Sequence, residues 1–159
     1  MGYGFGILTK YKIKNTELII LPPVKKDKKF GFLHAVIKTT EGDIDLINVH
    51  FENTNEGSKE HLRQTLEWCE KNGIKPIIAG DFNMKMTETL IELADKDYEI
   101  SYKIKNYKSF LPTEFSHDKE PLTLDYIIAH RGKFKMSKVD CVDNDISDHK
   151  PVIAELDLT

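Results

Sequence analysis

Residues 44–50 read IDLINVH, and residues 74–83 read IKPIIAGDFN. Each is a short apolar run that ends on polar side chains, which is typical of a buried strand giving way to a loop. Between them, apolar residues recur at helical spacing from Ser58, the expected N-cap, to Gly73, a stop signal. A strand, an amphipathic helix and a second buried strand predict a layered α/β domain.

Further strands are expected on both sides of this unit. Short runs rich in β-branched and aromatic residues predict strands at residues 3–10, 17–21, 30–38, 122–130, 133–142 and 151–158. Residues 41–43 predict a hairpin and residues 87–94 a short helix, while residues 98–121 are expected to be mostly loop with at most one strand. The length is within the usual size of one domain, so residues 1–159 are predicted to form a single folding unit.

With 40% hydrophobic and 31% charged residues, the composition is that of a water-soluble globular protein. The longest apolar runs are too short to cross a bilayer and no signal-peptide pattern opens the chain, so we expect no membrane span and a cytoplasmic location. Cys69 and Cys141 lie far apart without CxxC spacing, which favours two buried thiols over a zinc site or a disulfide.

The net charge of −3 is unevenly distributed along the chain. Residues 1–38 hold eight lysines and two acids, a charge of +6, and the remainder holds 15 basic and 24 acidic residues, a charge of −9. A basic segment can contact a polyanion. The KKDKK run at residues 25–29 follows two prolines, however, and is more simply a solvated loop.

Two motifs place polar groups at the ends of strands. In GDFN, a two-residue spacing lets Asp81 and Asn83 point to one side, where a carboxylate and an amide can hold a phosphate oxygen and orient water or metal. In SDHKP, Asp148 is a hard oxygen ligand of the kind that Mg²⁺ prefers, and His149 is the side chain most easily poised as a general base. Taken alone, each motif is better explained as a polar turn.

Two further polar residues stand in or at the end of apolar strands. Asp125 interrupts the run LTLDYIIA, where a buried carboxylate is costly unless it is paired. A histidine partner would become a competent base through this pairing, and without one Asp125 would face solvent on an edge strand. His50 ends the strand that begins LINV, and by itself it is more often a packed residue than a catalytic one.

In order along the chain, NVH ending at His50, GDFN, LDY and SDHKP resemble the motif series of the endonuclease/exonuclease/phosphatase superfamily, the group with the deoxyribonuclease I-like fold. The opening GFGILTKYKI is also similar to a strand of that superfamily, so the resemblance covers nearly the whole chain. It implies a four-layer α/β/β/α sandwich with its site at one end between two sheets. Asp81 and Asn83 would lie beside the scissile phosphate, and His50 would steady it.

The resemblance also implies a metal ligand and a base. Asp148 would ligate Mg²⁺ or Mn²⁺, and His149 paired with Asp125 would assist proton transfer. The attacking water would be deprotonated either by that pair or by Asp81. The implied activity is hydrolysis of a phosphodiester. We expect nucleic acid as the leading substrate class, but the sequence does not separate it from phosphoinositide, phospholipid or a small phosphodiester.

One expected part of the superfamily pattern is missing. Its members carry an Asn in the first strand and a metal-ligating Glu before the strand that resembles GFGILTKYKI, whereas this chain begins at Met1. We therefore expect an N-terminally truncated sandwich without its first strands and helix. Such a chain should hold Mg²⁺ weakly and should expose sheet edges that a homodimer or a partner chain would cover. The alternative function is a non-catalytic remnant that binds nucleic acid, a phosphorylated ligand or a protein partner.

Overall fold

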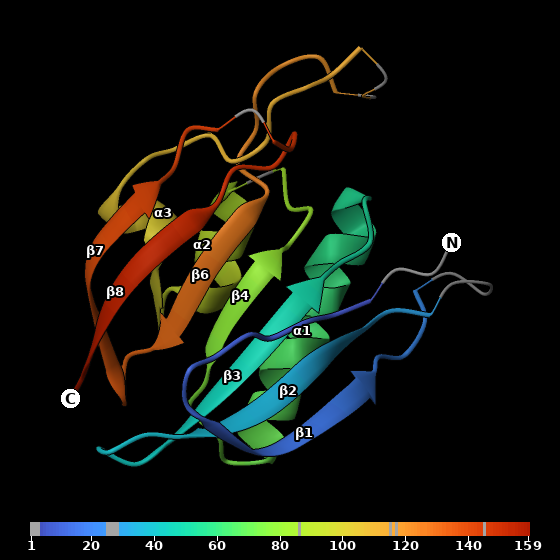
Figure 1. Cartoon of the computed structure of the whole chain (residues 1–159). Helices are drawn as coiled ribbons and strands as arrows, with labels where there is room; N and C mark the ends of the chain where they lie inside the picture. Colours follow the sequence, from blue (N-terminus) through green and yellow to red (C-terminus); the bar gives the residue numbers. More distant parts are fainter. Residues whose placement is uncertain (1–3, 25–28, 86, 115, 117, 145) are drawn as a thin grey trace.

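The structure, a computed structural model, describes residues 4–24, 29–85, 87–114, 116, 118–144 and 146–159. Its main element is a six-stranded sheet with the strand order β1-β2-β3-β4-β6-β5 (Figure 1). The strands are β1 (Lys12–Ile20), β2 (Gly31–Lys38), β3 (Asp43–His50), β4 (Ile77–Asp81), β5 (Tyr98–Ile100) and β6 (Asp125–His130). The pair β3 and β4 is parallel because helix α1 (Asn55–Lys71) connects them as a crossover, and the other pairs are antiparallel.

Helices cover one face of this sheet, and a second sheet covers part of the other (Figure 1). The helix layer consists of α1 and α2 (Thr87–Ala94), and the second sheet pairs β7 (Phe134–Cys141) with β8 (Val152–Leu158). A single helical turn, α3 (Ser101–Ile104), contacts β5, β6 and β7. The described residues thus form three of the four expected layers, and none of them forms a helix layer outside the second sheet. None of the described helices is long and apolar enough to cross a membrane.

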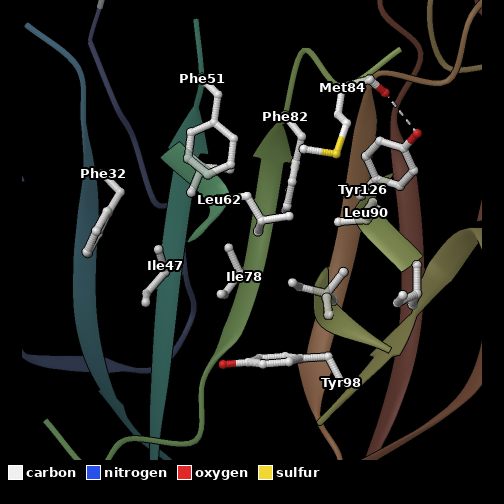
Figure 2. Packing of buried hydrophobic residues seen from close by; sticks show 14 of the residues in the cluster. Phe32, Ile47, Phe51, Leu62, Ile78, Phe82, Met84, Leu90, Tyr98 and Tyr126 are labelled. Atoms are coloured by element: carbon white, nitrogen blue, oxygen red, sulfur yellow. Dashed lines mark hydrogen bonds between the residues drawn. The ribbon is translucent and has the colours of Figure 1, made fainter. Parts of the chain in front are cut away.

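Alternation along the strands divides the apolar core into two parts. Between the large sheet and the helices lie fully buried side chains of β2, β3, β4, α1 and α2 (Figure 2), including Phe32, Ile47, Ile78, Leu62 and Leu90. Between the two sheets lies a smaller cluster, with Ala129, Phe134, Met136 and Val139 as buried members. Because burying one large apolar side chain contributes about 1.5–3 kcal/mol, both clusters stabilise the arrangement of the strands that carry the polar motifs.

Most predicted elements are present, but the first predicted strand is wrong. Residues 4–9 have no strand pairing, and residue 3 of that prediction lies outside the described residues. The segment is held instead by Asn48, whose Nδ2 donates a hydrogen bond to the carbonyl oxygen of Gly6 at 2.9 Å. Leu8 is fully exposed. An apolar run forms a strand only where a neighbouring strand accepts its ladder, and no described strand pairs with this run.

The start of α1 also differs from the prediction. Thr54, not Ser58, is the N-cap: its backbone is extended and its Oγ1 accepts a hydrogen bond from the Gly57 N–H at 3.1 Å. Ser58 is buried within the helix. Two candidate caps four residues apart cannot be separated by residue type, and the backbone conformation decides between them. Of the two free thiols, Cys69 is buried as predicted and Cys141 is only half-buried.

Candidate active site

Three of the predicted site residues lie side by side on adjacent strands. His50 ends β3 and Asp81 ends β4, and the two are register partners in the parallel pair. Asp125 begins β6 and is the register partner of Asp81 in the antiparallel pair. Because register partners point to the same face, the three side chains form a row at one end of the sheet. His50 Nε2 lies 3.6 Å from Asp81 Oδ2.

The residue after each member of this row is aromatic and points to the opposite face. Phe51, Phe82 and Tyr126 are at most 1% exposed and pack edge to face in series, with ring centroids 5.3 and 5.5 Å apart (Figure 2). Successive residues of an extended chain point to opposite faces. Burial of the three rings in the helix-side core therefore directs the three polar side chains toward the side of the second sheet.

The backbone at the end of β4 depends on two residues with positive φ. Gly80 has a φ of +138°, and a Cβ here would clash with the carbonyl oxygen of Val49 in β3. Asn83 has a φ of +48°, so the extended conformation does not continue through GDFN. The Asn83 N–H donates to Asp81 Oδ1 at 2.8 Å, and its amide donates to the Phe51 carbonyl at 2.9 Å. GDFN therefore forms a polar turn and also contributes to the candidate site, because Asn83 orients the Asp81 carboxylate.

The histidine partner predicted for Asp125 is present. His149, from the loop that precedes β8, has its Nδ1 atom 2.8 Å from Asp125 Oδ2. The side chains of His149 and Asp125 are 31% and 19% exposed, so the pair is shielded from water on most sides but remains accessible to a substrate. Together with His50 and Asp81, the pair forms a group of four titratable side chains across the end of the sheet.

These groups shift one another's pKa values. Burial, and then the neighbouring Asp125 carboxylate, raise the pKa of Asp81, while the Asn83 N–H and the nearby histidines oppose the increase. The hydrogen bond to Asp125 raises the pKa of His149 against the effect of burial, and the Asp81 and Asp148 charges add to the increase. A carboxyl and an imidazole that both hold their protons more tightly than usual are candidates for proton transfer near neutral pH.

The predicted metal ligand, Asp148, has an exposed side chain next to His149. Its Oδ1 accepts a hydrogen bond from Ser147 Oγ at 3.3 Å. Within the described part of the chain, no three His, Cys, Asp or Glu side chains are grouped so that they could hold a metal. Mg²⁺ commonly keeps several waters and binds through one or two carboxylates together with substrate phosphates. The exposed Asp148 carboxylate beside His149 would therefore fit only a weakly held, largely hydrated ion.

A groove of about 590 Å³ opens beside His50 and Asn83, which both line it. The groove is also lined by apolar side chains, among them Ile20 and Phe30. Lys29, the last residue of the basic KKDKK run, stands at the same groove, and the four residues before it lie outside the described residues. A volume of this size accommodates a small ligand or part of a larger one.

Two residues that hold the site together were not predicted from the sequence. Both lie in residues 98–121, a stretch predicted to be mostly loop. Ser109 Oγ accepts hydrogen bonds from the N–H groups of Leu124 and Asp125, each at 3.0 Å. The ring of Phe110 packs edge-on against His149, with centroids 5.2 Å apart. These contacts join positions far apart in the sequence, so no local pattern signals them.

A sequence profile of the Endonuclease/Exonuclease/phosphatase family matches residues 1–149. The chain belongs to this family. No curated protein matches the chain. The predicted deoxyribonuclease I-like fold is confirmed by its similarity to solved structures of family members and related proteins.

Three such structures illustrate the likeness. A conserved protein of unknown function from Enterococcus faecalis V583 has a TM-score of 0.77 and 18% identity, over 94% of this chain and 68% of that one. TDP2 from D. rerio, complexed with single strand DNA product, has a TM-score of 0.73 and 14% identity, over 92% and 67%. The human Nocturnin catalytic domain with bound sulfate has a TM-score of 0.67 and 19% identity, over 94% and 60%. The chain thus spans 60% to 68% of the length of these Endonuclease/Exonuclease/phosphatase-like structures.

Proposed function

We propose that the chain is a metal-dependent phosphodiesterase domain that hydrolyses nucleic acid by in-line attack of an activated water. One observation carries the proposal: the Asp81 carboxylate has His50 on one side and the His149–Asp125 pair on the other. Two imidazoles around a shielded carboxylate at an open end of a sheet are suited to moving protons to and from phosphate oxygens. Membership of the Endonuclease/Exonuclease/phosphatase family supports phosphoester chemistry.

The hydrogen bond to Asp125 assigns the two ring nitrogens of His149 different tasks. Nδ1 donates its proton to the carboxylate, which leaves Nε2 to accept a proton from the attacking water. Asp81 is the alternative base, because its raised pKa brings it closer to the pH range in which a carboxylate exchanges protons efficiently. His50, whose Nε2 lies 3.6 Å from Asp81 Oδ2, would donate a ring N–H to a phosphate oxygen.

Asp148 would hold the Mg²⁺ or Mn²⁺ ion. When bound, the ion supplies positive charge that offsets the charge developing on the phosphoryl oxygens. The remaining tasks belong to the chain itself. Asn83 holds Asp81 in place, and the buried aromatic residues beneath the row keep its members in register.

Two features favour nucleic acid as the substrate class. The groove beside His50 combines the aromatic ring of Phe30 with the cation of Lys29, which suits a base and its neighbouring phosphate. The similarity to TDP2, whose structure contains a single strand DNA product, supports the same class. Because the net charge of the chain is −3, contact with the polyanion is expected to be local.

The test measures the initial rate of bis(p-nitrophenyl) phosphate hydrolysis in the presence of Mg²⁺. Excess EDTA should abolish the activity, and His149→Ala should lower the rate by about 10²-fold or more, as for other general acid–base groups. His130→Ala is the matched control, since His130 ends β6 at the opposite end from Asp125 and should leave the rate unchanged. Equal rates for His149→Ala and the parent chain would refute the proposed mechanism. A rate that EDTA does not change would refute the proposed metal dependence.

A second experiment separates the enzyme from a non-catalytic binding domain. Mg²⁺ is titrated into the chain by calorimetry in the presence and absence of a short single-stranded oligonucleotide, and the oligonucleotide is then analysed for cleavage. Cleavage that depends on Mg²⁺ supports the phosphodiesterase. Retention of intact oligonucleotide with no cleavage at any Mg²⁺ concentration would instead favour the non-catalytic alternative.

A further inference from the structure

Among the described residues, the first half of β6 has no neighbouring strand along one edge. On one side β4 pairs with β6 from Asp125 to Ala129, but on the other side β5 pairs only with residues 128–130. In an antiparallel ladder, alternate residues direct their N–H and C=O groups to opposite sides. The N–H and C=O groups of Asp125 and Ile127 point to the uncovered edge, where a shielded backbone group without a partner is destabilising.

Three hydroxyl groups satisfy this edge in place of a strand. Ser109 Oγ accepts a hydrogen bond from the Asp125 N–H at 3.0 Å, and the Tyr107 hydroxyl donates to the Asp125 carbonyl at 2.9 Å. Ser101 Oγ accepts from the Ile127 N–H at 3.1 Å and lies 2.7 Å from the Tyr107 hydroxyl. Ser101 and Ser109 are both 0% exposed, so water does not compete for these contacts.

Ser109 also reaches the loop that carries the histidine. Its carbonyl oxygen accepts a hydrogen bond from the Lys150 N–H at 2.7 Å. The next residue, Phe110, forms an isolated β-bridge with His149 and packs its ring against the imidazole. A single short segment is therefore bonded to both halves of the pair, since the hydroxyl side of Ser109 faces Asp125 and its carbonyl side faces the loop.

We propose that Ser109 is a positioning residue that sets the geometry of the His149–Asp125 pair. Its hydroxyl fixes the backbone of the aspartate and its carbonyl fixes the loop of the histidine, so that the carboxylate and the imidazole meet at 2.8 Å. Ser109 acts through these two residues and not on the substrate. The kinetic consequence rests on the proposed phosphodiesterase function, whereas the effect on the hydrogen bond of the pair does not.

The kinetic test compares Ser109→Ala with Ser101→Ala, a matched control. Both serines are buried and both accept a hydrogen bond from the backbone of β6, but Ser101 bonds two residues beyond Asp125, and Ser109 also accepts one from the Leu124 N–H. Ser109→Ala should lower kcat about 10- to 100-fold with KM little changed, because misplacing a catalytic group is costly even when the substrate still binds. Ser101→Ala also removes a buried acceptor of a β6 N–H group and should lower the melting temperature, but it should keep kcat. Ser109→Thr, which retains the hydroxyl, should restore most of kcat.

The geometric test needs no activity. A proton shared between His149 Nδ1 and Asp125 gives a downfield NMR resonance, which should persist in Ser101→Ala and shift or vanish in Ser109→Ala. If the alanine variant does not fold, Ser109→Cys keeps a weak acceptor in the same place and should show a smaller change in the same direction. Equal kcat losses in the two serine variants, with the resonance unchanged in both, would overturn the proposal. If the parent chain hydrolyses no phosphodiester, the proposed function is refuted. The NMR comparison would still decide the role of Ser109.

Discussion

Among the described residues, two histidine–aspartate hydrogen bonds, His149–Asp125 and His34–Asp45, have nearly equal lengths but different surroundings. His149 Nδ1 lies 2.8 Å from Asp125 Oδ2, and His34 Nε2 lies 2.9 Å from Asp45 Oδ1. The imidazole of His149 is 31% exposed and that of His34 only 10%. The first pair joins a strand to a loop at the end of the sheet, whereas the second joins the neighbouring strands β2 and β3 within it.

The neighbours of the two pairs differ more than the pairs themselves. The His34 ring points toward the helix layer and packs against Trp68 of α1, with centroids 5.3 Å apart. The His149 pair instead lies beside a third titratable group, Asp81, whose pKa it helps to set. A phosphate has no access to an imidazole packed under a helix. The comparison teaches that a histidine–aspartate bond becomes a candidate catalytic device only with an open face and further polar groups around it.

The largest expected difference between the pairs is in activity. Asp125→Asn removes the charge that orients His149 and supports its protonation, so the rate on bis(p-nitrophenyl) phosphate should fall by about 10²- to 10⁴-fold. Asp45→Asn makes the same chemical change in the buried pair and should leave the rate unchanged. Initial rates of the two variants at saturating Mg²⁺ measure this. A comparable loss in both would mean that the pairs are not functionally distinct.

The next expected difference is in stability, and here the His34 pair should matter more than the His149 pair. His34→Ala leaves Asp45 with no imidazole partner and removes a ring that packs on Trp68, so it should lower the free energy of unfolding by about 1–3 kcal/mol. His149→Ala should cost less, because its site is open enough for water to replace the lost hydrogen bond. Urea unfolding of both variants gives the two values. A larger loss for His149→Ala would contradict the assignment of His34 to structure and His149 to function.

A smaller effect on stability is expected at Asp81, which lies beside the His149–Asp125 pair and not beside the His34–Asp45 pair. Its pKa is higher in the folded protein than its ordinary value of 3.8, so above that range the ionised carboxylate disfavours folding. Asp81→Asn keeps an acceptor for the Asn83 N–H and should raise the melting temperature at neutral pH, by about 2–4 °C for each kcal/mol gained. The gain should shrink as the pH falls toward 3.8, while activity is lost at every pH. Calorimetry at several pH values tests this, and a lower melting temperature at pH 7 would refute it.

The smallest expected effect is the pH dependence that His149 gives to stability. Its pKa is raised above 6.5 in the folded protein, so its favourable contribution is complete below pH 6.5 and is lost as the pH rises through the folded-state value. The difference in unfolding free energy between the parent chain and His149→Gln should therefore narrow at alkaline pH. NMR titration of His149 provides the independent value, which Asp125→Asn should lower. A difference in unfolding free energy that widens as the pH rises would contradict a raised pKa of His149 in the folded protein.

Sequence patterns predicted the parts of the site that end strands. The apolar runs before His50 and Asp81 have the alternation and length of buried strands, and the costly position of Asp125 within an apolar run indicated that it needed a partner. The same kind of pattern failed at residues 4–9, because a strand also needs a neighbour. It also gave no sign of Ser109, since a serine in a loop resembles any other until the segment it bonds is known.

By itself, the sequence determined most of the strands and helices and the polar side chains at their ends, because alternation, helical spacing and turn residues act over a few neighbouring positions. It left open which of six histidines would pair with Asp125, although the resemblance to a family pointed to His149. Only the tertiary structure decided this pairing, and with it the different settings of His34 and His149. Strand register, the aromatic residues beneath the row and the bonds of Ser109 bring together groups that are distant along the chain, and no local pattern contains that information.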